Sequence, residues 1–249
     1  MAAMAAASAM VVSAAIGRLP DMSKFDPARI KTLTFDCYGT LIDWEAGALD
    51  ALRPLLARHG ATPSDDEIIA VFQDLDASLC KPPYKPYRAV LAGVVEGLGR
   101  HFGASLKPED RDALALSIPS WKPFPDTVAA LRALRRRCRL AIISNIDDDL
   151  FAASARQLEV PFDAVVTAGQ ARCYKPDAAI FEEALRCLGG PPSAVAHVAE
   201  GVGEVAPARR LGCSTVWVRR NGRSARLLAE APDLEVPDLQ SLLVPLSAQ

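Results

Sequence analysis

Apolar residues recur along the chain at two different spacings, which predict where strands and helices fall. Short apolar runs such as LTF before Asp36 and LAIIS before Asn145 are typical of buried strands. Longer stretches such as IDWEAGALDALRPLLARHG, which ends at Gly60, repeat apolar residues at helical intervals. From residue 122 onward, strand and helix patterns alternate. This alternation predicts an α/β fold, with a parallel sheet covered by helices on both faces.

A purely helical stretch interrupts this alternation directly after the first strand. The segments DDEIIAVFQDLDASL and YRAVLAGVVEGLGRHFG both have helical spacing, and no strand pattern lies between them. We therefore predict a core domain made of residues 22–44 and 122–249, with a helical cap domain, residues 45–121, over the carboxyl edge of the sheet. Residues 1–21 are alanine-rich, have no basic segment typical of a secretion signal, and precede a second methionine. We expect them to be a disordered extension.

Composition and charge narrow the classes of function. The chain has 249 residues, half of them hydrophobic, which is enough for a sizeable core. Its net charge of −2, with both signs interspersed, gives no electrostatic basis for binding nucleic acid, and no stretch is suited to spanning a membrane. The six cysteines form no CxxC pair and do not cluster with the three histidines, which argues against a metal site and favours a reducing compartment. We expect a globular, cytoplasmic protein.

Polar side chains follow the predicted strands at the point where each one ends. They are Asp36, Ser144, Asn145, Lys175, Glu200 and Glu204. Because ligands of open α/β sheets bind at the carboxyl ends of the strands, we expect these groups to lie close together. An ammonium group beside Asp36 would keep that carboxyl ionised. An ionised carboxylate can act as a nucleophile, so the pattern indicates covalent catalysis.

Several of these residues also have a purely structural interpretation. Ser144 and Asn145 could cap the helix that follows them. Tyr38 could be a packed aromatic side chain, and Glu204 could lie in a solvated helix start. His197, in the middle of a predicted strand, is interpreted as a core histidine with its hydrogen bonds satisfied, and we leave it out of the predicted site.

Four motifs together resemble the haloacid dehalogenase superfamily. They are FDCYGTL, SN after a strand, YKP at the start of a helix, and HVAE, in this order, with a helical insert after the first motif. The resemblance extends from residue 30 to 222 and implies a three-layer Rossmann-like core with an inserted cap. Phosphatases of the superfamily bind magnesium and carry a second aspartate two residues after the nucleophile. Tyr38 at that position is similar to the L-2-haloacid dehalogenase branch (type II), where it would adjoin the substrate.

The resemblance implies a role for each matching residue. Asp36 would attack the carbon that bears the halogen, and water would then hydrolyse the resulting aspartyl ester. Lys175 would hold Asp36 ionised, Ser144 and Asn145 would position the substrate carboxylate, and Thr40 would support the turn that follows the nucleophile. The resemblance further implies a small organic acid as substrate, no metal and no cofactor. Dimers are common in this family, so a homodimer is the expected assembly.

The sequence departs from the dehalogenase pattern at three places. The cap stretch AVFQDLDASL lacks the arginine that holds the leaving halide in such enzymes, and Arg88 is the nearest cap arginine that could replace it. Phe181 stands where the family has an aromatic hydroxyl. The fourth motif, HVAEGVGEV, is one residue shorter and has Gly201 where a hydroxyl or amide is expected. Glu204 is then the acid left to orient the hydrolytic water, and a misplacement of about 1 Å could cost on the order of 100-fold in rate.

Three functional hypotheses follow. The first is a metal-independent 2-haloacid dehalogenase with an aspartyl ester intermediate. The second is a use of the same scaffold to bind or convert a different organic substrate, with or without hydrolysis. The third, a magnesium-dependent phosphatase, is the weakest because Tyr38 replaces the general acid that an alcohol leaving group needs.

Overall fold

The computed structural model describes residues 24–220 and 230–247. It contains a six-stranded sheet in the order β3-β2-β1-β4-β5-β6, with every neighbouring pair parallel. The strands are β1 (Thr32–Phe35), β2 (Arg139–Ser144), β3 (Ala164–Thr167), β4 (Val195–Ala199), β5 (Ser214–Val218) and β6 (Leu234–Val236). The fold is therefore α/β with a parallel sheet, as predicted.

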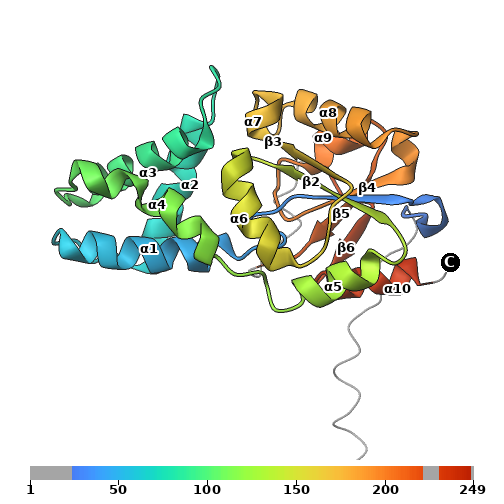
Figure 1. The fold of residues 1–249 in the computed structure, drawn as a ribbon, viewed down its shortest axis with the longest axis horizontal. Helices are drawn as coiled ribbons and strands as arrows, with labels where there is room; N and C mark the ends of the chain where they lie inside the picture. The colour runs from blue at the N-terminus through green and yellow to red at the C-terminus, as the bar shows by residue number, and fades with distance from the viewer. Residues whose placement is uncertain (1–23, 221–229, 248–249) are drawn as a thin grey trace, which may run out of the picture.

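Helices cover both faces of the sheet and form a separate group beside it (Figure 1). Beside the sheet lie α1 (Trp44–Arg58), α2 (Asp65–Leu79), α3 (Tyr87–Phe102) and α4 (Ala113–Ser117). One face carries α8 (Ala178–Leu188) and α9 (Val205–Arg210), and the other carries α5 (Thr127–Leu134), α6 (Asp148–Leu158) and α10 (Leu243–Leu246). The short α7 (Ala168–Ala171) directly follows β3.

Burial on both faces explains the composition of the central strands. Every residue of β1 and β4 is buried, and β2 is exposed only at its first residue. Strands covered on both faces in this way read as continuous apolar runs instead of alternating ones. After β1 the chain turns sharply, and Gly39 has a φ of +99°, a backbone conformation that favours glycine. The turn leaves Asp36 at the carboxyl end of β1.

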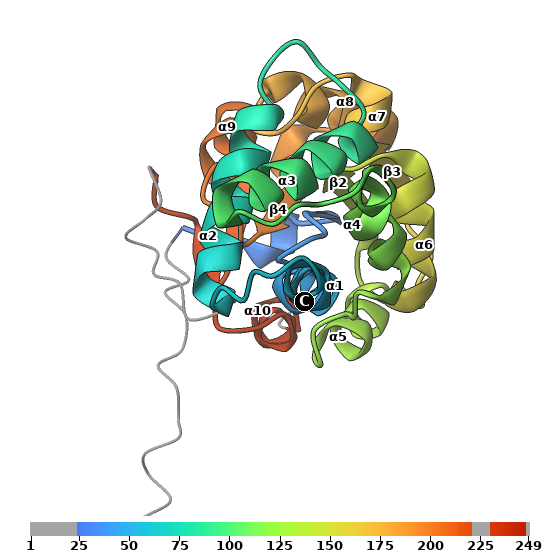
Figure 2. The same ribbon diagram turned by 90° about the vertical axis from the view of Figure 1, so that its left-hand side faces the viewer.

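Helices α1 to α4, together with their connections, form what we call the helical unit, residues 44–120 (Figure 2). The two chain segments that join it to the sheet run side by side, because Ile42 and Pro123 form an antiparallel bridge and the Asp43 amide donates to the Lys122 carbonyl over 2.9 Å. This geometry is compatible with the predicted insertion. The boundaries 22–44, 45–121 and 122–249 themselves stay a prediction.

A residue outside the helical unit, Asp147, caps the start of α3. The carboxylate of Asp147, which precedes α6, accepts hydrogen bonds from the backbone amides of Tyr87 at 2.9 Å and Arg88 at 2.8 Å. These amides belong to the first turn of α3, where backbone donors have no partner within the helix. The residue before α3 is Pro86, whose side chain cannot cap it. Asp147, which lies between β2 and α6, therefore caps helix α3 of the helical unit.

The structure differs from the sequence predictions mainly at short elements. In the region of alternating patterns after residue 122, helix α5 begins only at Thr127, because Pro123 and Pro125 precede it. Strand β3 ends at Thr167, whose hydroxyl accepts from the Gln170 amide at the start of α7. Strand β6 and helices α4 and α10 have three to five residues each and were not predicted. The extension predicted for residues 1–21 lies outside the described residues, within which no helix has the length and apolar character needed to cross a membrane.

Candidate active site

A cavity of about 240 Å³ lies where the strand ends face the helical unit. The residues predicted at the strand ends all line it: Asp36, Ser144, Asn145, Lys175, Glu200 and Glu204. Its opposite wall includes Trp44, Phe72, Asp76 and Tyr87 of the helical unit. The parallel sheet thus brings together side chains that are far apart in the sequence.

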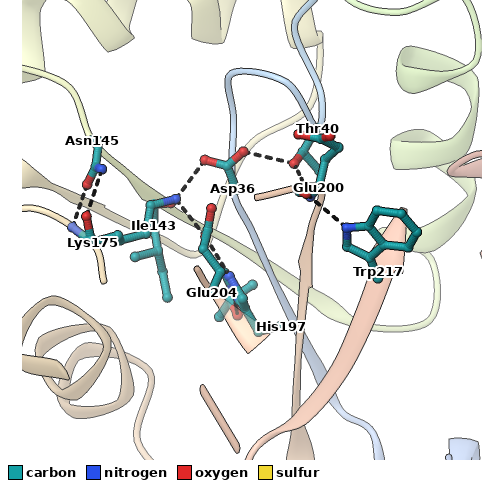
Figure 3. Close-up of polar contacts among 10 residues, drawn as sticks. Asp36, Thr40, Ile143, Asn145, Lys175, His197, Glu200, Glu204 and Trp217 are labelled. Carbon is teal, nitrogen blue, oxygen red and sulfur yellow. Dashed lines mark hydrogen bonds and ion pairs between the residues drawn. The ribbon is translucent and has the colours of Figure 1, made fainter. Parts of the chain in front are cut away.

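Asp36 is held by a hydrogen bond at each of its carboxylate oxygens (Figure 3). Oδ1 accepts from the Lys175 ammonium at 2.6 Å, and Oδ2 accepts from the Thr40 hydroxyl at 2.8 Å. The Thr40 oxygen in turn accepts from the Glu200 amide at 2.9 Å. The side chain is 10% exposed, so these donors fix its orientation within the protein interior. Each oxygen keeps a further lone pair that can reach a substrate.

Lys175 connects the strand ends through its ammonium group. Besides Asp36, Nζ donates to Glu204 Oε2 at 2.8 Å and to the Ile143 carbonyl at 2.9 Å. The Asn145 side chain holds the backbone of Lys175, because Oδ1 accepts from the Lys175 amide at 2.7 Å and Nδ2 donates to its carbonyl at 3.3 Å. The amide of Asn145 therefore places Lys175, and its predicted contact with substrate stays a prediction.

The shared ammonium affects the two carboxyl groups differently. Burial raises the pKa of Asp36 above its ordinary value, Lys175 opposes this rise, and the nearby Glu204 carboxylate adds to it. Burial alone would also raise the pKa of Glu204, but Lys175 and His197 together bring it below the ordinary value. Although burial lowers the pKa of Lys175, the two carboxylates more than offset it, and the net pKa is raised. Lys175 therefore stays cationic, and Glu204 is the more acidic of its two partners.

His197 belongs to this network, although the sequence interpretation left it out. Its Nε2 lies 2.9 Å from Glu204 Oε2 (Figure 3). Its Nδ1 lies 3.0 Å from the Thr34 hydroxyl. The ring is buried in β4 and packs edge-on against Phe181, with 5.2 Å between ring centroids. The hydrogen bonds of His197 are satisfied, as the core interpretation expected, but one of them goes to an acid of the site. A lone polar residue in the apolar run AVAHVA was the available signal.

Gly201 makes room for the carboxylate of Glu204. A Cβ atom at residue 201 would lie 2.3 Å from Glu204 Oε1, closer than carbon and oxygen can approach without displacement. Glu204 is itself anchored by Lys175 and His197, so moving it would break those bonds. The short fourth motif and its longer acid are therefore matched to each other, because the Glu204 carboxylate occupies the space that a Cβ atom at residue 201 would fill.

The remaining predicted residues differ in where their polar atoms point. The buried hydroxyl of Ser144 has no hydrogen-bond partner among the described residues. Tyr38 lines the cavity, but its hydroxyl is 2.8 Å from Ser154 Oγ on α6. Arg88 does not line the cavity, because its guanidinium pairs with Asp149 at 2.6 Å across the start of α6. The structure thus places Arg88 outside the cavity in which it was expected to hold the leaving halide.

The helical unit contributes a pair of polar residues that the sequence interpretation missed. The Tyr87 hydroxyl on α3 donates to Asp76 Oδ1 on α2 at 3.0 Å, and both side chains line the cavity. Burial raises the pKa of Asp76 to about 6, although the hydrogen bond from Tyr87 acts in the opposite direction. Trp44 and Phe72 form the apolar part of this wall, with 4.8 Å between their ring centroids. Helical spacing alone does not tell which face of α2 meets the cavity.

The described acidic side chains of the cavity do not form a metal site. Within residues 24–220 and 230–247, no group of three or more His, Cys, Asp or Glu side chains is arranged to hold one. The cavity acids Asp36 and Glu204 instead share the Lys175 ammonium.

Known proteins similar to this chain cover most of its length. An (S)-2-haloacid dehalogenase from Pseudomonas sp. (strain YL) is 29% identical over 224 residues, which is 86% of this chain and 93% of that protein. Among solved structures, an L-2-haloacid dehalogenase covers 88% of this chain and 100% of its own, with 26% identity and a TM-score of 0.77. The L-2-haloacid dehalogenase from Xanthobacter autotrophicus has the same fold, with 23% identity, a TM-score of 0.73, and coverage of 86% of this chain and 96% of its own.

A family model described as haloacid dehalogenase-like hydrolase matches residues 30–212. The matched range begins before β1, ends after α9, and includes the helical unit and every residue of the Asp36, Lys175 and Glu204 network. The chain has the Rossmann-like core of this family and belongs to the haloacid dehalogenase-like hydrolases.

Proposed function

We propose that this hydrolase removes the halogen from small 2-halocarboxylates, without a metal ion, through an ester of Asp36. The observation that carries the proposal is the Asp36 carboxylate, which faces the cavity between the donors Lys175 and Thr40. Two residues further on, the place of a phosphatase general acid is taken by Tyr38, whose hydroxyl contacts Ser154. A halide leaves without a proton, so the arrangement suits dehalogenation better than phosphate ester hydrolysis.

In the first step, one Asp36 oxygen attacks the carbon that bears the halogen, from the side opposite the halogen. A carbon–oxygen bond forms as the carbon–halogen bond breaks, and the halide leaves with the bonding electron pair. Lys175 opposes the protonation of the attacking group that burial favours, and Thr40 orients it. The buried Ser144 hydroxyl is the donor we assign to the substrate carboxylate.

In the second step, water attacks the Asp36 carbonyl carbon, and the bond from that carbon to the ester oxygen breaks. The products are a 2-hydroxy acid and the regenerated carboxylate. We assign the orientation of this water to Glu204, which bonds Lys175 and His197 through Oε2 and so has Oε1 available. The water gives up both of its protons: one ends on the hydroxyl of the product, and the other passes to Glu204 and then to solvent as the Asp36 carboxylate is regenerated.

The test is to trap the ester. Halide release and intact-protein mass are measured after incubation with (S)-2-chloropropionate, with wild type and with Glu204→Gln, which is expected to slow hydrolysis. The expected result is halide release by wild type and an adduct on Asp36 in the variant, with no adduct in Asp36→Asn. A folded wild type that releases no halide from a panel of 2-chloro- and 2-bromocarboxylates, with no adduct in the variant, contradicts the proposal. Hydrolysis of an aryl phosphate that needs added magnesium would favour the phosphatase instead.

The relatives named above support the same proposal, since they are called (S)- or L-2-haloacid dehalogenases. A homodimer and a cytoplasmic location stay predictions. The location can be checked by cell fractionation. All six cysteines are free thiols, which is the state that a reducing compartment maintains.

A further inference from the structure

We propose that Asp76 takes up a proton when an anionic substrate enters the cavity, and that the resulting neutral carboxylic acid donates a hydrogen bond to that substrate. Asp76 would then be the specificity-determining residue of the wall opposite the nucleophile. The choice of a 2-halocarboxylate as substrate rests on the proposed function, whereas proton uptake on binding an anion can be tested without catalysis.

The position of Asp76 is the first argument. Its side chain projects from α2 into the cavity, where Oδ1 accepts from the Tyr87 hydroxyl at 3.0 Å. Tyr87 is fixed in turn, because its backbone amide donates to Asp147 at 2.9 Å. Burial raises the pKa of the Tyr87 phenol well above its ordinary value, so Tyr87 remains a donor across the accessible pH range. Oδ2 of Asp76 has no hydrogen-bond partner among the described residues and can carry the proton.

The charge of the cavity is the second argument. Its described lining residues include four carboxyl groups, those of Asp36, Asp76, Glu200 and Glu204, and one ammonium group, that of Lys175. No arginine is among them. Lys175 is already shared between two carboxylates. A substrate carboxylate would bring a further negative charge into a cavity of about 240 Å³, and like charges at such close range favour the uptake of a proton.

The third argument identifies the group that takes the proton. Asp36 and Glu204 are both paired with Lys175, but no lysine or arginine of the described residues forms an ion pair with Asp76. The titratable groups around Asp76 on its own wall are Tyr87, Cys80 and Tyr174, and across the cavity they are Asp36, Lys175, Glu200 and Glu204. Since burial raises the pKa of Asp76 to about 6, this carboxyl needs only a small further rise to be protonated at neutral pH. The proton comes from solvent and returns to it when the product leaves.

The proposal predicts that the cavity binds anions more weakly as the pH rises. The apparent affinity for an anion scales with the fraction of protein in the competent state, which here is the protonated one. Above pH 6 that fraction falls about tenfold per pH unit, so KM for (S)-2-chloropropionate should rise with pH in wild type. Asp76→Asn carries a neutral donor of similar size at every pH. Its KM should change little with pH, and at pH 8 it should be lower than that of wild type by up to about 100-fold.

The experiment compares KM and kcat from pH 5 to 9 for wild type, Asp76→Asn and Tyr87→Phe. Tyr87→Phe removes a hydrogen bond that lowers the pKa of Asp76, so its rise in KM should begin at higher pH. Asp74→Asn is the matched control, because Asp74 is exposed on the same helix and does not line the cavity. Its profile should equal that of wild type. Identical profiles for wild type and Asp76→Asn overturn the proposal.

A binding measurement separates this proposal from the proposed function. Propionate is titrated calorimetrically at pH 8 in two buffers of different ionisation enthalpy, which gives the number of protons taken up. We expect close to one proton for wild type and close to none for Asp76→Asn. Binding without proton uptake, or no binding by wild type, overturns the proposal. If propionate binds with proton uptake but no halocarboxylate is turned over, the proposed function fails and the role of Asp76 stands.

Discussion

The two walls of the cavity are built in different ways. At the strand ends, Asp36, Lys175, Glu204 and His197 form a continuous set of hydrogen bonds, and each charge there has a partner of opposite sign or a donor. On the helical unit, Asp76 Oδ1 accepts from the Tyr87 phenol at 3.0 Å and from the Cys80 thiol at 4.0 Å, and Asp76 has no cation as a partner among the described residues. A fully bonded group keeps its geometry and charge, whereas a group with only neutral partners can change its charge when a ligand arrives. Variants of the strand-end wall should therefore change the chemical steps, and variants of the opposite wall should change pH-dependent binding.

The largest effect is expected at the nucleophile. Asp36→Asn removes the attacking carboxylate but keeps the size of the side chain, while one of its two acceptor oxygens becomes an amide donor. Halide release should fall by about 10⁴-fold or more, as expected when the covalent nucleophile is lost. The assay is halide release under single-turnover conditions, with the melting temperature as a check of folding. Substantial residual release by a folded Asp36→Asn would show that this wall does not carry the chemistry.

Lys175→Met should have the next largest effect, because it leaves Asp36 and Glu204 buried without their shared cation. Loss of one partner from a buried ion pair costs about 3–5 kcal/mol of unfolding free energy. Chemical denaturation measures this cost. The double variant Lys175→Met, Asp36→Asn also removes one of the two unpaired carboxylates. It should recover part of the lost unfolding free energy. Equal stability of the single variant and wild type would mean that the charges of this wall do not depend on each other.

Gly201→Ala tests the match between Gly201 and Glu204. The new Cβ would displace the Glu204 carboxylate, and a shift of about 1 Å can cost roughly 100-fold in rate. The loss should fall on hydrolysis of the ester, so that a burst of halide release is followed by a slow phase. Adding Glu204→Asp, which shortens the acid by one methylene, should restore part of the slow phase. A uniform loss of both phases would contradict the assignment of Glu204 to the second step.

The smallest effect is expected for His197→Ala. The substitution leaves Glu204 with one fewer donor and leaves the Thr34 hydroxyl without its ring partner, which costs about 1–3 kcal/mol of unfolding free energy. Because His197 helps to lower the pKa of Glu204, that pKa should rise towards its ordinary value. Carboxyl titration followed by NMR measures it. An unchanged Glu204 titration would place His197 outside the network.

The strand-end wall could be predicted largely from the sequence, and the opposite wall could not. Strand ends are marked by short apolar runs, and parallel topology brings them to one edge, so Asp36, Ser144 and Lys175 could be grouped without coordinates. The contact between Thr34 and His197 depends on the register between β1 and β4, which places these two residues side by side. A single sequence does not encode that register visibly.

The helical unit gave weaker signals for a physical reason. Its apolar spacing predicts helices, but the rotation of α2 that turns Asp76 inwards depends on its packing against α3. Arg88 pairs with Asp149 at the start of α6, a contact that helical spacing within α3 does not reveal. The strand β6 was missed because three residues flanked by turns carry too little periodicity to recognise.

The carboxylate of Asp147 limits how far the helical unit can be separated from the rest of the chain. It supplies the acceptor for two amides at the beginning of α3, and Pro86 offers no substitute. The segment 44–120 is thus continuous in sequence but depends on a residue outside it. The first amides of α3 donate to Asp147, which lies 60 positions after Tyr87. Without Asp147, the first turn of α3 would fray when that segment is expressed by itself. This turn carries Tyr87, the phenol partner of Asp76.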